Sequence, residues 1–117
     1  MNRMRKRTAV LVAAAALCLS SSPAAWASAV TGRVTKVQTR ASDGLQLVEV
    51  DGARSAAPSC ATHLYFIIRD ERSDAGKAQY AMLMAAWLAD KVVTIHGQDV
   101  CSRWGDGEDI LAVTYGR

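Results

Sequence analysis

The chain has 117 residues, half of them hydrophobic, and a formal net charge of +3 at pH 7. This length suits one small domain with a limited core. Four of the basic residues lie within the first seven positions, whereas ten basic and eleven acidic residues follow residue 29, so that part has a net charge of −1. The composition therefore argues against a protein that binds nucleic acid or anionic membranes through its overall charge.

Residues 1–29 have the pattern of a signal peptide. A basic start is followed by an apolar run over residues 9–19, which is too short to span a bilayer, and no later run reaches a spanning length. The overlapping motifs Ala25-Trp26-Ala27 and Ala27-Ser28-Ala29 predict cleavage after Ala27 or Ala29. We therefore expect one exported domain, residues 30–117, that is periplasmic or secreted and makes no stable membrane insertion.

Two cysteines, Cys60 and Cys101, follow the predicted signal peptide. In an oxidising compartment, an even pair in a small domain is expected to form a disulfide. Closing a loop of about 42 residues stabilises such a domain by roughly 4 kcal/mol in the chain-entropy model. A catalytic or metal-binding role is the weaker alternative, because the sequence has no C-x-x-C motif.

The first half of the domain reads as strands. Residues 30–41 are rich in valine and threonine, and Val34 and Val37 have opposite parity, so this strand either bulges or exposes one valine. Asp43-Gly44 predicts a turn into a second strand over residues 45–50.

Residues 63–69 predict a third strand that is apolar on both faces. Such a strand is either central in a barrel, covered on both sides, or has one face in contact with a partner. The last predicted strand, residues 110–115, is also apolar on both faces.

A single helix is predicted between the third and fourth strands. Ser73 and Asp74 are good N-caps, and residues 78–91 are rich in helix formers. The helical spacing predicts one buried stripe composed of Tyr80, Leu83, Met84, Trp87 and Leu88. A β-branched strand over residues 92–96 follows and ends before Gly97.

The predicted order is β-β-β-α-β-β, so the fold is mainly β with one helix. This is the order of the OB-fold, a five-stranded Greek-key barrel. The alternative is an α+β fold with an open antiparallel sheet and one helix.

Three short features carry a resemblance to a known family. They are the segment A-D-K-V-V-T-I-H-G at residues 89–97, the pair Cys101-Ser102, and Cys60 before the third strand. With the leader and the strand order, the chain resembles small exported bacterial proteins that are similar to the B subunit of subtilase cytotoxin. That resemblance implies an OB-fold, export and a disulfide, and it implies glycan binding by a homo-oligomer. No glycan-contacting residue of the toxin subunit can be matched to a position in this chain.

The loop over residues 97–109 holds the candidate ligand-binding residues. Trp104, with Arg103 and Ser102, is a candidate platform for stacking a sugar ring. The alternative is that Trp104 folds back and caps the barrel end beside the disulfide.

Asp106, Glu108 and Asp109 are candidate calcium ligands in the same loop, but their spacing does not match an EF-hand. Because acidic turns are usually only solvated, the main expectation is no metal and no cofactor. His63 and His96 are the only histidines, and no G-x-S-x-G motif is present. We therefore expect no catalytic residues and no enzymatic activity.

These observations predict an exported, non-enzymatic binding module for a glycan or a protein, as a monomer or a homo-oligomer, with no nucleic-acid partner. The alternative is a structural or accessory envelope protein that binds no small molecule.

Overall fold

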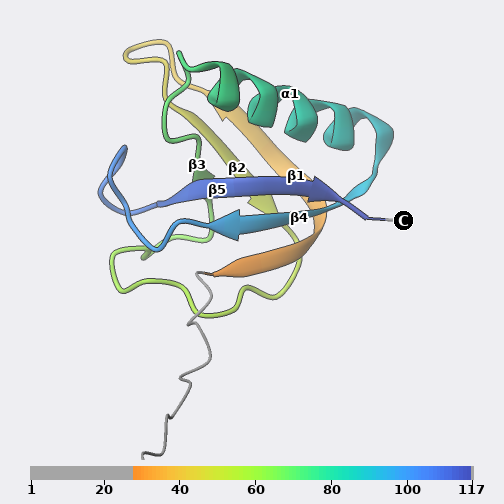
Figure 1. Ribbon diagram of the computed structural model, residues 1–117, viewed down its shortest axis with the longest axis horizontal. Coiled ribbons are helices and arrows are strands. Elements are labelled where there is room, and N and C mark those ends of the chain that lie inside the picture. The colour runs from red at the N-terminus through yellow and green to blue at the C-terminus, as the bar shows by residue number, and fades with distance from the viewer. Residues whose placement is uncertain (1–27, 117) are drawn as a thin grey trace, which may run out of the picture.

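The computed structural model describes residues 28–116 of the chain (Figure 1). Of the predicted signal peptide, only Ser28 and Ala29 are among the described residues. In chain order the elements are β1 (Ala29–Thr39), β2 (Gln46–Val50), β3 (Phe66–Ile67), α1 (Asp74–Ala89), β4 (Val92–Gly97) and β5 (Glu108–Tyr115). The predicted order β-β-β-α-β-β is confirmed.

The five strands close into a barrel in the order β1-β2-β3-β5-β4. Strand β1 pairs antiparallel with β4 through its first half and with β2 through its second half, and β3 and β5 pair in parallel. Figure 1 shows β1 crossing the molecule between these two partners, with α1 lying over one side of the barrel. The OB-like barrel is therefore confirmed, and the open-sheet alternative is wrong because β4, the last strand in this order, pairs back with β1 and closes the sheet.

Two bulges adapt the long strands to the curvature of the barrel. The register of β1 shifts between Val34 and Lys36, which leaves Val34 buried and lets Val37 pack against the same core. The bulged alternative for this strand is confirmed. In β5, Ile110 pairs with Gly97 and Ala112 with His96, so Leu111 has no partner and its side chain is 57% exposed.

Strand β3 is covered on both faces, as the barrel interpretation predicted. Phe66 and Ile68 lie in the barrel core, whereas Ile67 packs in a second cluster with Leu45 and Leu47. The regular pairing is shorter than predicted, and Leu64, just before it, is 77% exposed. The exposed leucine is in the loop and not on a strand face.

Helix α1 begins where predicted. Ser73 Oγ accepts a hydrogen bond from Gly76 N at 2.9 Å, and Asp90 ends the helix in the left-handed conformation with φ 51°.

The predicted buried stripe of α1 is wrong at its C-terminal end. Leu83 and Ala86 are buried, but Trp87 is 48% exposed and Leu88 is 77% exposed. The contact face is set by Gly76, where an added Cβ would lie 1.9 Å from the Asp70 carbonyl oxygen. Only glycine permits this approach, so α1 packs through the face that continues from Gly76 to Leu83 and Ala86.

Candidate functional site

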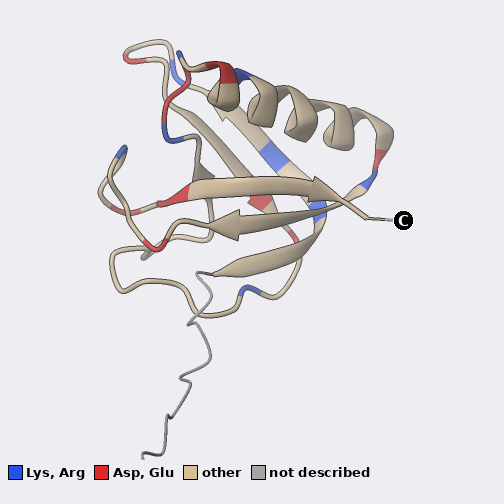
Figure 2. Cartoon of the chain, viewed as in Figure 1, with Lys and Arg blue, Asp and Glu red and all other residues tan. Residues whose placement is uncertain are grey.

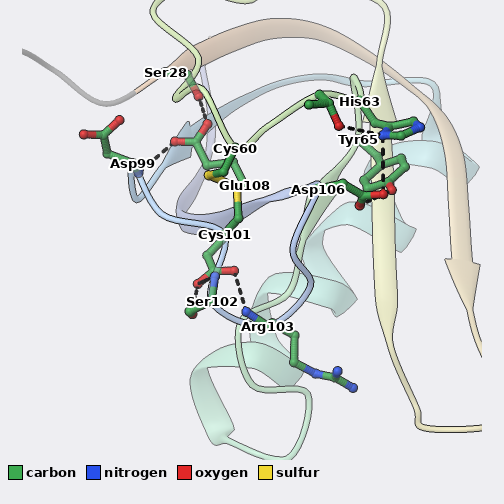
Figure 3. Close-up of a disulfide and its surroundings, with 12 residues drawn as sticks. Ser28, Cys60, His63, Tyr65, Asp99, Cys101, Ser102, Arg103, Asp106 and Glu108 are labelled. Carbon is green, nitrogen blue, oxygen red and sulfur yellow. Dashed lines mark hydrogen bonds and ion pairs between the residues drawn. A yellow bond between two sulfur atoms is a disulfide. The ribbon is translucent and has the colours of Figure 1, made fainter.

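The disulfide joins the two loops that border one end of the barrel. Cys60 and Cys101 are bonded at 2.19 Å, with their Cα atoms 6.2 Å apart (Figure 3). Cys60 precedes β3 and Cys101 follows β4. The predicted disulfide therefore fixes the β4–β5 loop, residues 98–107, against the loop before β3.

A buried carboxylate holds the middle of the β4–β5 loop. Asp109 is completely buried and accepts hydrogen bonds from Ser102 Oγ and from the backbone N–H groups of Ser102 and Arg103, both at 3.3 Å. The hydroxyl of Ser102, a predicted ligand-binding residue, is thus hydrogen-bonded within the loop to Asp109. The neighbouring Arg103 backbone is fixed by the same side chain (Figure 3).

A second buried carboxylate holds the start of the same loop. Glu108 is completely buried and accepts from Asp99 N at 2.8 Å, from Arg54 Nη2 at 2.5 Å, and from Ser28 Oγ. The Arg54 guanidinium also lies 4.1 Å above the Phe66 ring. Sequence reasoning missed this role, because an acidic residue in a Gly-rich loop is typical of a solvated turn.

The three candidate calcium ligands have separate partners. Glu108 and Asp109 bind the groups described above, and Asp106 accepts a hydrogen bond from Tyr65. Within residues 28–116, no three His, Cys, Asp or Glu side chains converge in an arrangement that suits a metal ion. The structure therefore brings these carboxylates into three different interactions and gives the calcium hypothesis no support.

Arg103 and Arg40 tie three loops together through ion pairs. Arg103 binds Glu71 through two nitrogens, at 3.1 and 2.9 Å, and donates to the Asp43 carbonyl oxygen at 3.1 Å. Arg40 Nε donates to Asp43 Oδ1 at 2.8 Å. The bond to Arg40 lowers the pKa of Asp43 well below its usual range, and the bond to Arg103 lowers the pKa of Glu71. The β1–β2, β3–α1 and β4–β5 loops are thus held in one network.

Trp104 lies at the surface of this network. Its side chain is 39% exposed, and the Arg40 guanidinium lies 4.1 Å from the ring centroid. It therefore packs on a residue of the β1–β2 loop and still presents ring surface to solvent. A hollow of about 240 Å³ is lined by Trp104, Gly105 and Asp106.

Three polar groups stand beside this hollow. Tyr65 OH donates to Asp106 Oδ1, His63 Nδ1 lies 3.5 Å from Asp106 Oδ2, and the His63 and Tyr65 rings stack at 5.1 Å (Figure 3). Burial and the bond to Asp106 raise the pKa of Tyr65 to about 12. The phenol is therefore neutral at physiological pH and donates its proton to the carboxylate. Sequence reasoning missed Tyr65 and Arg40, which are far from Trp104 along the chain.

The other histidine is elsewhere in the fold. His96 lies in β4, where it pairs with Ala29 and Ala112, and no contact with His63 is seen among the described residues. Another hollow, of about 620 Å³, lies beside Arg33, Asp90 and Tyr115. There Arg33 is already paired with Asp90 at 3.1 Å.

The Lys and Arg positions are spread along the described chain, over strands, loops and the ends of α1 (Figure 2). On β1, Arg33 pairs with Asp90 and Lys36 pairs with Glu49. Across residues 28–116, no helix is both long and apolar enough to cross a bilayer.

The site thus consists of a partly exposed indole and a carboxylate from the β4–β5 loop, with an imidazole from the loop between β2 and β3. No known protein family, curated protein or solved structure matches the chain.

Proposed function

We propose that the protein is an exported, non-enzymatic binding module whose ligand is a carbohydrate held at the Trp104–Asp106 hollow. The observation that carries the proposal is the partly exposed Trp104 ring beside the Asp106 carboxylate, in a hollow of about 240 Å³. Both residues lie in the β4–β5 loop, and Trp104 contacts Arg40 of the β1–β2 loop. OB barrels bind oligosaccharides and oligonucleotides at these two loops.

The chemistry of the site suits a neutral sugar ring. The apolar C–H face of a pyranose stacks on an indole, and its hydroxyls donate to a carboxylate. Asp106 has a side chain that is 37% exposed and shares its oxygens between Tyr65 and His63, so lone pairs remain for a ligand. The hollow has a single stacking ring, so we expect it to hold a terminal sugar or one unit of a longer chain.

A nucleic-acid strand suits this surface less well. Single-stranded nucleic acid needs a basic groove beside the stacking rings. Here Arg40 and Arg103, the cations nearest Trp104, are bound to Asp43 and Glu71. Their charges are therefore already compensated within the site.

The loops that carry the site are held before any ligand arrives. The disulfide, the buried Asp109 and the Arg103–Glu71 pair all restrain residues 98–107. A preformed site loses little conformational entropy on binding, which favours measurable affinity from a few contacts. The resemblance to the subtilase cytotoxin B subunit points to the same class of ligand and to a homo-oligomer.

The test is a glycan array probed with the oxidised domain, followed by titration calorimetry with each sugar that binds. Trp104→Ala is expected to abolish binding, because it removes the stacking surface. The matched control is Trp87→Ala, since Trp87 has a similar exposed fraction but lies on α1. Trp87→Ala should leave binding unchanged.

Two results would contradict the proposal. One is binding that survives Trp104→Ala, and the other is a blank array for a correctly folded, oxidised domain. A blank array would favour a protein ligand or the alternative of an accessory envelope protein. Light scattering during size-exclusion chromatography reports the oligomeric state, and a monomer at high concentration would remove the homo-oligomer from the proposal.

A further inference from the structure

The residue before β1 is built into the barrel. Ser28 is completely buried, and its carbonyl oxygen accepts a hydrogen bond from Gly97 N at 2.7 Å. Its hydroxyl donates to the buried Glu108 carboxylate (Figure 3). Arg54 Nε donates to the same hydroxyl at 3.4 Å. Ser28 is thus hydrogen-bonded to both members of the Arg54–Glu108 ion pair, which holds the start of the β4–β5 loop.

The next residue, Ala29, is also paired on both sides. It is the first residue of β1 and lies opposite His96 of β4. Ser55 N donates to the Ala29 carbonyl oxygen at 3.0 Å, and Ala29 N donates to Ser55 Oγ at 3.3 Å. Ala29 therefore links β1 to the loop that carries Arg54.

The sequence offers two cleavage motifs, and they differ in what they leave of these contacts. Cleavage after Ala29 would remove both residues. Gly97 N and the Glu108 carboxylate would each lose a partner in a buried position, and leaving buried polar groups unpaired is costly. Cleavage after Ala27 leaves the contacts described above in place.

We propose that a signal peptidase hydrolyses the Ala27–Ser28 bond and that Ser28 is the N-terminal residue of the mature protein. The amide C–N bond breaks, the hydroxyl of the water joins the Ala27 carbonyl carbon, and the proton goes to the Ser28 nitrogen. The new terminus is a free amine. This inference rests on the export in the proposed function and is independent of the ligand.

The first test is the intact mass of the exported protein. The 117-residue chain is expressed with its leader in a bacterium, and the product is isolated from the periplasm and the medium. The expected mass is that of residues 28–117 with one disulfide. A product that begins at Val30, or at any other residue, overturns the inference. An uncleaved chain in the cytoplasm instead overturns the export on which it rests.

The second test asks whether Ser28 and Ala29 matter for the reason given. Two chains that begin at Ser28 and Val30 are released from a removable fusion partner, oxidised and unfolded in urea. The Val30 chain is expected to show an unfolding equilibrium constant at least about tenfold larger, because it leaves buried polar groups unpaired. Equal constants would overturn the structural argument. Ser28→Ala in the longer chain should reproduce part of the change, since it removes only the hydroxyl.

Discussion

The Arg54–Glu108 ion pair is the most buried charge interaction in the described residues, and Arg54→Met tests it directly. The two side chains are 8% and 0% exposed, and Nη2 and Oε1 are 2.5 Å apart. Methionine can still cover Phe66, whose ring the guanidinium now stacks on at 4.1 Å. The substitution therefore removes the charge and its hydrogen bonds while most of the apolar contact stays. Breaking a buried pair by removing one partner typically costs about 3–5 kcal/mol.

The free energy of unfolding of the oxidised domain, from urea titrations, is the quantity to measure. A loss of about 3–5 kcal/mol would be a large part of the stability of a domain of this size. The effect should persist at high salt, because a buried pair is screened much less than an exposed one. Lys36→Met is the matched control: Lys36 and Glu49 pair at 3.3 Å, but their side chains are 46% and 34% exposed. That change should cost less than about 1 kcal/mol.

A loss for Arg54→Met as small as that for Lys36→Met would refute the reasoning. It would mean that water reaches the Glu108 carboxylate in the folded protein, so that its charge needs no fixed partner.

Three further predictions follow from the same structure. Replacing both cysteines by alanine should lower the free energy of unfolding by about 4 kcal/mol, and reductant should shift the urea midpoint of the native protein but not of this variant. Leu83→Ala should lower the free energy of unfolding by about 2–5 kcal/mol, because Leu83 is completely buried in the core. Leu88→Ala, on the exposed side of α1, should lower it by less than about 0.5 kcal/mol. Equal losses would contradict the observed helix face. Asp43 and Glu71 have lowered pKa values in the folded state, so their contribution to stability is present above their ordinary pKa of about 4 and is lost as the pH falls from there through the lower folded values. A urea midpoint that stays constant from pH 5 to pH 2 would contradict this.

The fold was predictable where it depends on local sequence. Ser73 predicts the first turn of α1, and the opposite parity of Val34 and Val37 predicts the bulge in β1. Both could be predicted because each sequence pattern lies within a few residues of the feature that it indicates. The pairing of β1 with β2 and β4 was implied only by the order of the elements.

The helix face could not be predicted because α1 is apolar around most of its circumference. Leu83 and Leu88 are the same residue type on one helix, yet only Leu83 meets the core. The choice is made by the close contact at Gly76, which depends on where residue 70 lies in space. The helical spacing of apolar residues does not reveal that contact.

The site was predictable only in part for a similar reason. Trp104 is visible in the sequence as an aromatic residue in a loop, but its neighbours Arg40 and Tyr65 come from other loops and are brought to it by barrel closure. Glu108 and Asp109 look like loop carboxylates, yet both are completely buried. Their role depends on the donors that surround them.

The buried carboxylates explain how so small a domain can hold the loop that carries Trp104 in a defined conformation. A ten-residue loop with two glycines would ordinarily sample many conformations, and ordering it would cost free energy on binding. Here Glu108 accepts a hydrogen bond from the backbone N–H of Asp99, and Asp109 accepts from those of Ser102 and Arg103. The disulfide anchors Cys101, which lies between Asp99 and Ser102. The loop therefore loses its conformational entropy during folding and oxidation, and not on ligand binding. It follows that reduction of the disulfide should weaken ligand binding more than it weakens the barrel core, because the core cluster lies inside the strands while Trp104 depends on the loop.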